Sequence, residues 1–285
     1  MASLFTSWRE QIAAHEREAA ALHGNEGGHG HGHGHGEAQG GRNRFAARQD
    51  NPDRTDDPVL NSLYAAVGPQ TTVLDIGGGT GRYAIPLASR AKHVTVVDPS
   101  DGSVERLQSI AAERGITNIT AITSDWETAD VEAADIVLCS LVLHHVPDIQ
   151  PFMLKLAQMA TDRVMVVEMM EFPGMIETPF YQRVHGSDPT PLPALPDLMN
   201  VLWEMDVHPD LEMFPSTPPR LEADKAGALE YLRGRLGVEA GTEKDKRLQS
   251  AITELIEETP SGLISKGVKP QRLGIVSWRP EGVGH

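Results

Sequence analysis

The strongest constraint on the fold of this chain is a regular alternation of two kinds of segment between residues 57 and 170. Short apolar runs rich in valine and isoleucine alternate with amphipathic stretches of about ten residues or more. The short runs are typical of buried parallel strands, and the longer stretches are typical of crossover helices. The alternation therefore predicts an α/β fold with a doubly wound, mostly parallel, Rossmann-like sheet covered by helices on both faces.

The expected elements follow from the position of each run. We expect strands at 72–77, 94–98, 119–125, 135–142, 163–170, 211–214 and 273–280. We expect helices at 58–68, 82–91, 102–115, 149–160, 195–206, 223–236 and 243–258. The last helices are insertions near the C-terminus.

The chain divides into three segments by composition. Residues 1–23 predict an N-terminal helix, in which Leu4, Trp8 and Ile12 share one face and favour docking on the fold. Residues 24–56 are rich in histidine and glycine and predict a flexible linker. Residues 57–280 predict the folded domain, with a cofactor half at 57–170 and acceptor-side and C-terminal elements at 171–280.

The charge balance bears on the partners. The chain has 25 Lys and Arg against 40 Asp and Glu, which gives a formal net charge of −15. An acidic surface repels phosphate backbones and anionic lipid heads, so we expect neither a nucleic-acid nor a membrane partner. Cys139 is the one cysteine, which excludes an intrachain disulfide and a cysteine-built zinc site. With no long apolar span or signal-peptide pattern, a reducing compartment, the cytoplasm, is expected.

The glycine loop after the first expected strand reads Asp75-Ile76-Gly77-Gly78-Gly79-Thr80-Gly81. A dinucleotide-binding loop that begins at Gly77 has its third glycine where Arg82 stands, which argues against a nicotinamide oxidoreductase. No Gly-Lys-Ser/Thr follows, so the loop is not a phosphate-binding loop of nucleotide hydrolases.

Four segments, in order, resemble the motifs of class I S-adenosylmethionine-dependent methyltransferases of the small-molecule type: VLDIGGGTG, VTVVDPS, SDWE and ADIVLCSLVLHHVPD. The resemblance implies that S-adenosylmethionine is the cofactor. It implies that Asp98 binds the ribose, Asp125 the adenine amino group and Asp75 the amino group of the methionine moiety. The full set of implied cofactor contacts is Asp75, Gly77, Gly79, Gly81, Asp98, Pro99, Asp125, Trp126 and Ser140.

Three side chains are candidates for a catalytic base. His144 and His145 follow the fourth strand of the cofactor half, and Glu168 ends the fifth. Positioning alone supplies much of the rate of methyl transfer, and a base helps when the acceptor is a hydroxyl or a protonated amine. The alternative for either histidine is a loop residue that holds the turn.

The sequence indicates the methyl acceptor only through motifs of nucleic-acid methylases that it lacks. Methylases of exocyclic base amines carry an Asn/Asp-Pro-Pro-aromatic stretch where this chain has Cys139-Ser140-Leu141-Val142. Cysteine nucleophiles of cytosine methylases follow proline, whereas Cys139 follows Leu138 and is expected to be a small buried strand residue. A small molecule is therefore the expected acceptor, with the methylated atom and the oligomeric state open.

Two alternatives belong to other functional classes. His29, His31, His33 and His35 alternate with glycine, and neutral imidazole suits zinc, nickel or copper, although this spacing defines no rigid site. In this alternative, the chain is a metal-binding protein that uses these four histidines. The other alternative is a non-catalytic fold that only binds the cofactor.

Overall fold

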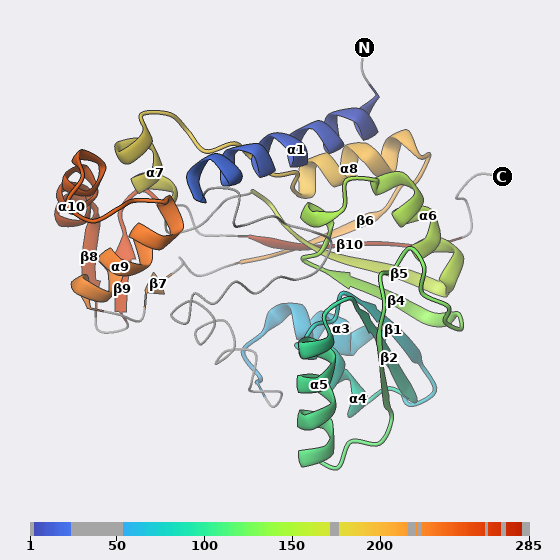
Figure 1. Ribbon diagram of the computed structural model, residues 1–285. Coiled ribbons are helices and arrows are strands. Elements are labelled where there is room, and N and C mark those ends of the chain that lie inside the picture. Colours follow the sequence, from blue (N-terminus) through green and yellow to red (C-terminus); the bar gives the residue numbers. More distant parts are fainter. Residues whose placement is uncertain are drawn as a thin grey trace.

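A seven-stranded sheet forms the centre of the computed structural model, which describes residues 3–23, 54–171, 177–215, 220–221, 224–259, 262–268 and 272–280 (Figure 1). Its strands are β1 (Thr72–Ile76), β2 (His93–Asp98), β3 (Ile119–Thr123), β4 (Ala134–Ser140), β5 (Ala160–Met169), β6 (Asp210–Phe214) and β10 (Leu273–Trp278). They lie in the order β3-β2-β1-β4-β5-β10-β6. The first five run parallel, and β10 is antiparallel to both of its neighbours. This confirms the predicted mostly parallel α/β fold.

Helices cover both faces of the sheet (Figure 1). One layer consists of α3 (Pro58–Ala66), α4 (Ala84–Ala88) and α5 (Asp101–Glu113), and the other of α1 (Leu4–His23), α6 (Ile149–Met159) and α8 (Leu195–Glu204). Successive strand residues alternate between the two layers: Val73 packs in the core under α3 and α4, whereas Leu74 and Ile76 pack in the core under α6 and α8. The predicted burial of both faces is therefore observed.

The helix α1 lies across the second layer and ties it to a more distant part of the chain. Trp8 and Ile12 are buried as predicted, and the Trp8 Nε1 donates to the Val146 carbonyl at 2.8 Å. Further along the helix, the Glu18 carboxylate accepts from the Thr190 amide at 2.7 Å and from the Tyr181 hydroxyl. Leu4 was expected on the buried face but is 40% exposed, because it stands at the first turn, beyond the packed part of the helix.

A second, smaller core lies to the side of the main sheet (Figure 1). It is built from α7 (Thr178–His185), α9 (Lys225–Leu236), α10 (Glu243–Leu255) and a three-stranded sheet of β7 (Arg220–Leu221), β8 (Ile256–Thr259) and β9 (Gly262–Ser265). We call these elements the small lobe. Sequence patterns indicated α9 and α10 but missed α7 and the three strands. The helix expected to reach residue 258 ends at Leu255, because the chain pairs with β9 from Ile256 onward.

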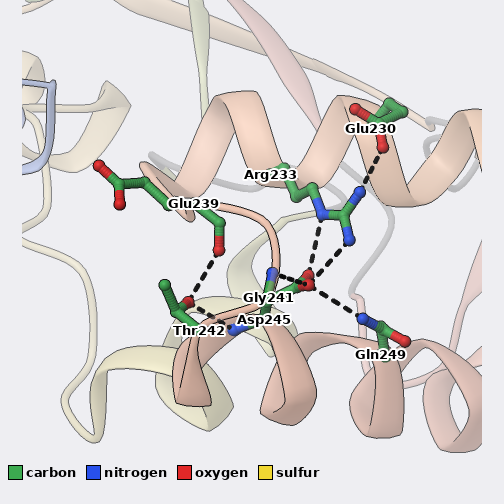
Figure 2. A network of polar contacts seen from close by, with 7 residues as sticks. All are labelled: Glu230, Arg233, Glu239, Gly241, Thr242, Asp245 and Gln249. Atoms are coloured by element: carbon green, nitrogen blue, oxygen red, sulfur yellow. Dashed lines mark hydrogen bonds and ion pairs between the residues drawn. The ribbon is translucent and has the colours of Figure 1, made fainter.

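A polar network joins α9 to the first turn of α10 (Figure 2). The buried Asp245 carboxylate accepts from the Arg233 Nε and Nη2, both at 2.8 Å, in a bidentate ion pair. It also accepts from the Gly241 amide at 2.8 Å and from the Gln249 side chain at 3.0 Å. The hydrogen bonds from Arg233 and Gly241 lower the pKa of Asp245 to about 2. Since the unfolded pKa is higher, this pair stabilises the fold above about pH 4 and ceases to do so as the pH falls through about 2.

We expect Asp245→Ala to loosen the small lobe, because it removes the acceptor of the Arg233 Nε and Nη2 and of the Gly241 amide. Amide hydrogen exchange should accelerate in α9 and α10, while protection of β1, β4 and β5 stays unchanged. Glu230→Ala is the matched control, since Glu230 pairs with the same arginine from an exposed position. Equal protection in the Asp245→Ala variant and the wild type would show that the network does not support the lobe.

Within the described residues, no helix combines the length and the apolar character that a membrane crossing requires.

Candidate functional site

The candidate site lies at the carboxyl edge of the main sheet, next to β1 and β4. The strand order reverses there, since β1 leads to β2 and β3 on one side and β4 leads to β5 on the other. Open α/β sheets bind ligands at this reversal, outside the carboxyl ends of the strands. The glycine loop, Asp98 and the segment after β4 all begin at this edge.

The glycines of the loop differ in what their missing side chains permit. A Cβ on Gly78 would lie 2.7 Å from an Asp75 oxygen and 2.8 Å from a Val96 methyl group, so Gly78 is required by the packing of the protein itself. Gly79 has a positive φ of 56°, and a Cβ there would meet nothing closer than the Asp98 carboxylate, at 4.0 Å. Gly79 is therefore the glycine that leaves space above the sheet edge. Gly77 and Gly81 pack closely on Val142 and Leu107.

Asp98 ends β2 and fastens the loop. Its carboxylate is buried and accepts from the Gly79 amide at 2.9 Å through one oxygen and from the Ser100 amide at 2.9 Å through the other. Each carboxylate oxygen has a second lone pair, so the group can still accept two further hydrogen bonds. Pro99, the next residue, is half-buried.

Asp75 lies on the same face of the sheet as Asp98 and is 1% exposed. No hydrogen bond to its carboxylate is found among the described residues, and no basic side chain in that part of the chain pairs with it. Burial, and then the negative charge of Asp98, raise the pKa of Asp75 to about 7. A buried carboxylate of this kind is stabilised by a cation, such as an ammonium group, placed beside it.

Asp125 and Trp126 follow β3, and they lie in different environments, one exposed and the other buried. The Asp125 side chain is exposed, while its carbonyl accepts from the Ala129 amide in a turn. Trp126 is buried in the core, with its ring 6.4 Å from that of Phe152 and the Lys155 ammonium 4.5 Å above it. The Trp126 ring therefore packs as a core aromatic. Ser140, at the end of β4, is half-buried.

The segment after β4 is a short 3-10 turn with a strained entry. Leu141 has a φ of 56°, a conformation that costs a residue with a side chain about 1–2 kcal/mol. The turn spans Leu143–His145, where His144 is half-buried and His145 is exposed. Their ring centroids lie 4.1 Å apart. Backbone strain of this kind concentrates at functional sites, which supports a functional role for the segment after β4.

Glu168, the third catalytic candidate, is completely buried near the end of β5. Its Oε1 accepts from the Met169 amide at 2.8 Å, and its Oε2 has no hydrogen-bond partner among the described residues. Burial raises the pKa of Glu168 to about 7. By strand alternation Glu168 faces the layer of α1, α6 and α8, whereas Asp75 and Asp98 face the layer of α3, α4 and α5. The sequence predicts that Glu168 and His145 both face the crevice at the edge of the sheet. The buried surroundings of Glu168 show no opening toward that crevice within the described residues.

Sequence patterns missed a basic cluster around Asp57, the N-cap of α3. The Asp57 carboxylate accepts from the Arg54 Nε at 2.8 Å and from the Arg82 Nη2 at 3.4 Å. Both guanidinium groups lie by the Tyr83 ring, at 5.5 and 5.4 Å from its centroid. Arg82 and Tyr83 directly follow the glycine loop, and this position was the signal available in the sequence. The predicted linker, residues 24–56, includes Arg54. Because Arg54 bonds to Asp57 in the structure, residues 54–56 are part of the described fold.

Two further features lie away from this edge. A groove of about 330 Å³ over α3, β6 and β10 is lined by Ser62, Arg163, Asp210, Leu211, Glu212 and Ser277, among others, and shares no residue with the site. No cluster of metal-ligating side chains occurs in the ranges that the structure describes. His29, His31, His33 and His35 lie outside those ranges. Cys139 is buried and free, as predicted for a small strand residue.

Known proteins resemble the part of this chain that forms the candidate site. Residues 73–162 match the family model described as a methyltransferase domain. A ubiquinone biosynthesis O-methyltransferase of Rickettsia conorii is 34% identical over 87 residues, which cover 30% of each chain. An uncharacterized protein of Haemophilus influenzae is 29% identical over 153 residues, 52% of this chain and 56% of its own. The chain thus spans about a third of the length of the ubiquinone O-methyltransferase.

The fold is also found among solved structures. The YcgJ protein of a Bacillus species covers 78% of this chain and 98% of its own, with a TM-score of 0.54 and 19% identity. At that identity the likeness concerns the fold alone.

Proposed function

Since residues 73–162 match the family model of a methyltransferase domain, we propose that the protein is a class I methyltransferase that transfers a methyl group from S-adenosylmethionine to a small-molecule acceptor. The observation that carries the proposal is the pair of buried carboxylates beside the open face of Gly79. The cofactor supplies an electrophilic methyl group on a sulfonium ion. The protein supplies the binding and alignment that make displacement of that methyl group fast.

The residues at the sheet edge fit this cofactor. Asp98 keeps two acceptor positions for the ribose hydroxyls, and its bond to the Gly79 amide holds the loop in place. Asp75 is a buried acid without a partner among the described residues, and it suits the ammonium group of the methionine moiety. Asp125 is an exposed acid after β3 that suits the adenine amino group. Gly77, Gly79, Gly81, Pro99 and Ser140 complete the proposed surface, and Trp126 supports it from the core.

The acceptor side is proposed on general grounds. The net charge of −15 disfavours nucleic acid as substrate, which supports a small molecule. The ubiquinone O-methyltransferases match only within 30% of this chain, so they support methyl transfer and leave the acceptor atom open. His145, with His144 or Glu168, is proposed as the base for an acceptor that must lose a proton. A cytoplasmic location is a prediction from the single cysteine together with the lack of a long apolar span or signal-peptide pattern in the sequence.

Calorimetry and a transfer assay test the proposal together. S-adenosylmethionine and S-adenosylhomocysteine should both bind, whereas NAD should not. With labelled S-adenosylmethionine and a panel of phenols, amines and thiols, label should pass to one class of acceptor. Absence of binding by either nucleoside would refute the proposed function, and binding without transfer to any acceptor would favour the non-catalytic alternative.

The raised pKa of Asp75 predicts a pH dependence of cofactor binding. Below pH 7 Asp75 is mainly protonated, so binding of an ammonium group must first release that proton. We expect S-adenosylhomocysteine to bind about tenfold more weakly at about pH 6 than at about pH 8, with proton uptake by the buffer near pH 6. Calorimetry in two buffers of different ionisation enthalpy measures both quantities. Asp75→Asn should bind weakly at every pH; a pH profile identical to that of the wild type would exclude Asp75.

A further inference from the structure

A lysine of α6 binds the turn that follows β3. The Lys155 ammonium donates to the carbonyls of Trp126 at 2.6 Å, Ala129 at 2.8 Å and Glu127 at 3.3 Å. An ammonium group has three donors, so these three carbonyls can engage all of them. Among the described residues no carboxylate forms an ion pair with Lys155, and its neighbours along α6 are mainly apolar and buried. The charge of this half-buried lysine is therefore directed at the backbone of one turn.

The turn that Lys155 binds begins at Asp125. The Asp125 carbonyl accepts from the Ala129 amide at 2.9 Å and from the Thr128 amide at 3.2 Å, which closes a single helical turn. The carbonyls at the end of such a turn carry partial negative charge, and a cation placed there stabilises them. Lys155 therefore stabilises the C-terminal end of the turn whose first residue is Asp125.

The Trp126 ring gives α6 a second contact with the same turn. The Lys155 Nζ lies 4.5 Å from the ring centroid, at cation–π distance. The Phe152 ring meets the Trp126 ring edge-on, with centroids 6.4 Å apart and an interplanar angle of 65°. Phe152 and Lys155 are three residues apart and so lie on the same side of α6. Since Trp126 is 4% exposed, its ring cannot turn away without displacing these neighbours.

The Asp125 carboxylate, by contrast, is exposed and depends on the backbone for its position. No hydrogen bond within the described residues orients its oxygens, although its carbonyl is fixed in the turn. Discrimination between an amino group and a carbonyl oxygen on a ligand requires an acceptor held at hydrogen-bond distance, about 2.7–3.2 Å. The rigidity of the turn thus decides how well Asp125 can discriminate between the two.

We propose that Lys155 is a positioning residue for the choice of nucleobase, an assignment that rests on the proposed function. Through the turn from Asp125 to Ala129, Lys155 keeps the Asp125 carboxylate where the adenine amino group donates to it. A base that carries an oxygen in place of that amino group brings two acceptors face to face, so it binds more weakly. In this role Lys155 acts through the backbone and needs no contact with the base.

Two nucleosides that differ at one exocyclic group test the assignment. S-adenosylhomocysteine carries the amino group, and S-inosylhomocysteine carries an oxygen there. Calorimetry with the full chain should show that the wild type prefers S-adenosylhomocysteine by about tenfold or more, the effect of one charge-assisted hydrogen bond. Lys155→Met keeps the length of the stem and removes the ammonium, so the ratio of the two dissociation constants should fall by about three- to tenfold. Lys155→Arg restores donors and charge, so most of the ratio should return.

Gln158→Met is the matched control, because Gln158 is exposed on the same helix and receives the same new side chain. It should leave the ratio unchanged. Adding Lys155→Met to Asp125→Ala should lower the ratio no further than Asp125→Ala alone, since the lysine acts through that carboxylate. In the free protein, exchange of the Thr128 and Ala129 amides with solvent deuterium should accelerate in Lys155→Met. Lys155→Gln, a shorter uncharged replacement, gives the same comparison if the methionine variant does not fold.

The assignment is overturned if Lys155→Met weakens binding of both nucleosides equally, which identifies a residue that only supports the fold. It is also overturned if the double variant loses more discrimination than Asp125→Ala, or if the wild type binds both nucleosides alike. In each of these cases S-adenosylhomocysteine still binds, so the proposed function stands. Binding of neither nucleoside to the wild type would instead refute the proposed function together with this assignment.

Discussion

Replacing His145 by alanine should lower turnover by about two to four orders of magnitude, the usual contribution of a general base. His145 is exposed at the end of the 3-10 turn after β4, on the carboxyl side of the sheet. An imidazole there can take a proton near neutral pH from an acceptor held against the methyl group. Affinity for S-adenosylhomocysteine should hardly change, because the proposed cofactor contacts are Asp75, Asp98 and the glycine loop. Steady-state kinetics with calorimetry and a melting curve measure all three quantities.

Two further variants separate the possible bases. His144→Ala tests the half-buried neighbour, whose ring lies 4.1 Å from that of His145. Glu168→Gln keeps the shape of the side chain and removes its charge. Burial raises the pKa of Glu168 from 4.5 to about 7, so the wild type loses stability as the pH rises from about 4.5 through 7, and the glutamine variant should not. Full turnover in all three variants would leave alignment alone as the source of the rate. A loss of turnover accompanied by a lower melting temperature would identify His145 as a turn residue.

Asp98→Ala should weaken binding of S-adenosylhomocysteine by about a hundredfold or more. In the proposed site the variant would lose two charge-assisted hydrogen bonds to the ribose, each of roughly 1.5–3 kcal/mol. It also releases the Gly79 and Ser100 amides, which hold the loop. Calorimetry with both proteins measures the change.

Asp98→Asn serves as the companion variant, because the amide keeps one acceptor oxygen and nearly the same volume. We expect its affinity to lie between those of the alanine variant and the wild type. Unchanged affinity in the alanine variant would remove Asp98 from the proposed cofactor site.

The order of strands and helices in the cofactor half could be predicted because each element has its own periodicity. Asp75 and Asp98 stand at strand ends, where sequence position alone determines which edge of a parallel sheet they reach. The helix expected at 82–91 is confined to Ala84–Ala88, since the first residues still belong to the turn of the loop. Boundaries of this kind depend on packing that a local pattern does not contain.

The small lobe and the basic cluster escaped prediction for a common reason. Strands β8 and β9 have four residues each, too few to show an alternation. Arg54 and Asp57 are close in sequence, but Arg82 and Tyr83 reach them only in three dimensions, and an isolated arginine in a polar segment is typical of a solvated surface. The burial of Glu168 was likewise unpredictable, because it depends on α1, α6 and α8 covering that face of the sheet.

The contacts of α1 have a consequence for the order in which the chain folds. Trp8 bonds to Val146 and Glu18 to Thr190, partners that are separated in sequence by 138 and 172 residues. During synthesis α1 therefore has no place to dock until the segments that contain Val146 and Thr190 have followed it. Contacts between such distant residues form slowly, and an early amphipathic helix with an uncovered Trp8 is a surface that chaperones bind. Docking of α1 is thus expected to be the late event that completes the native state.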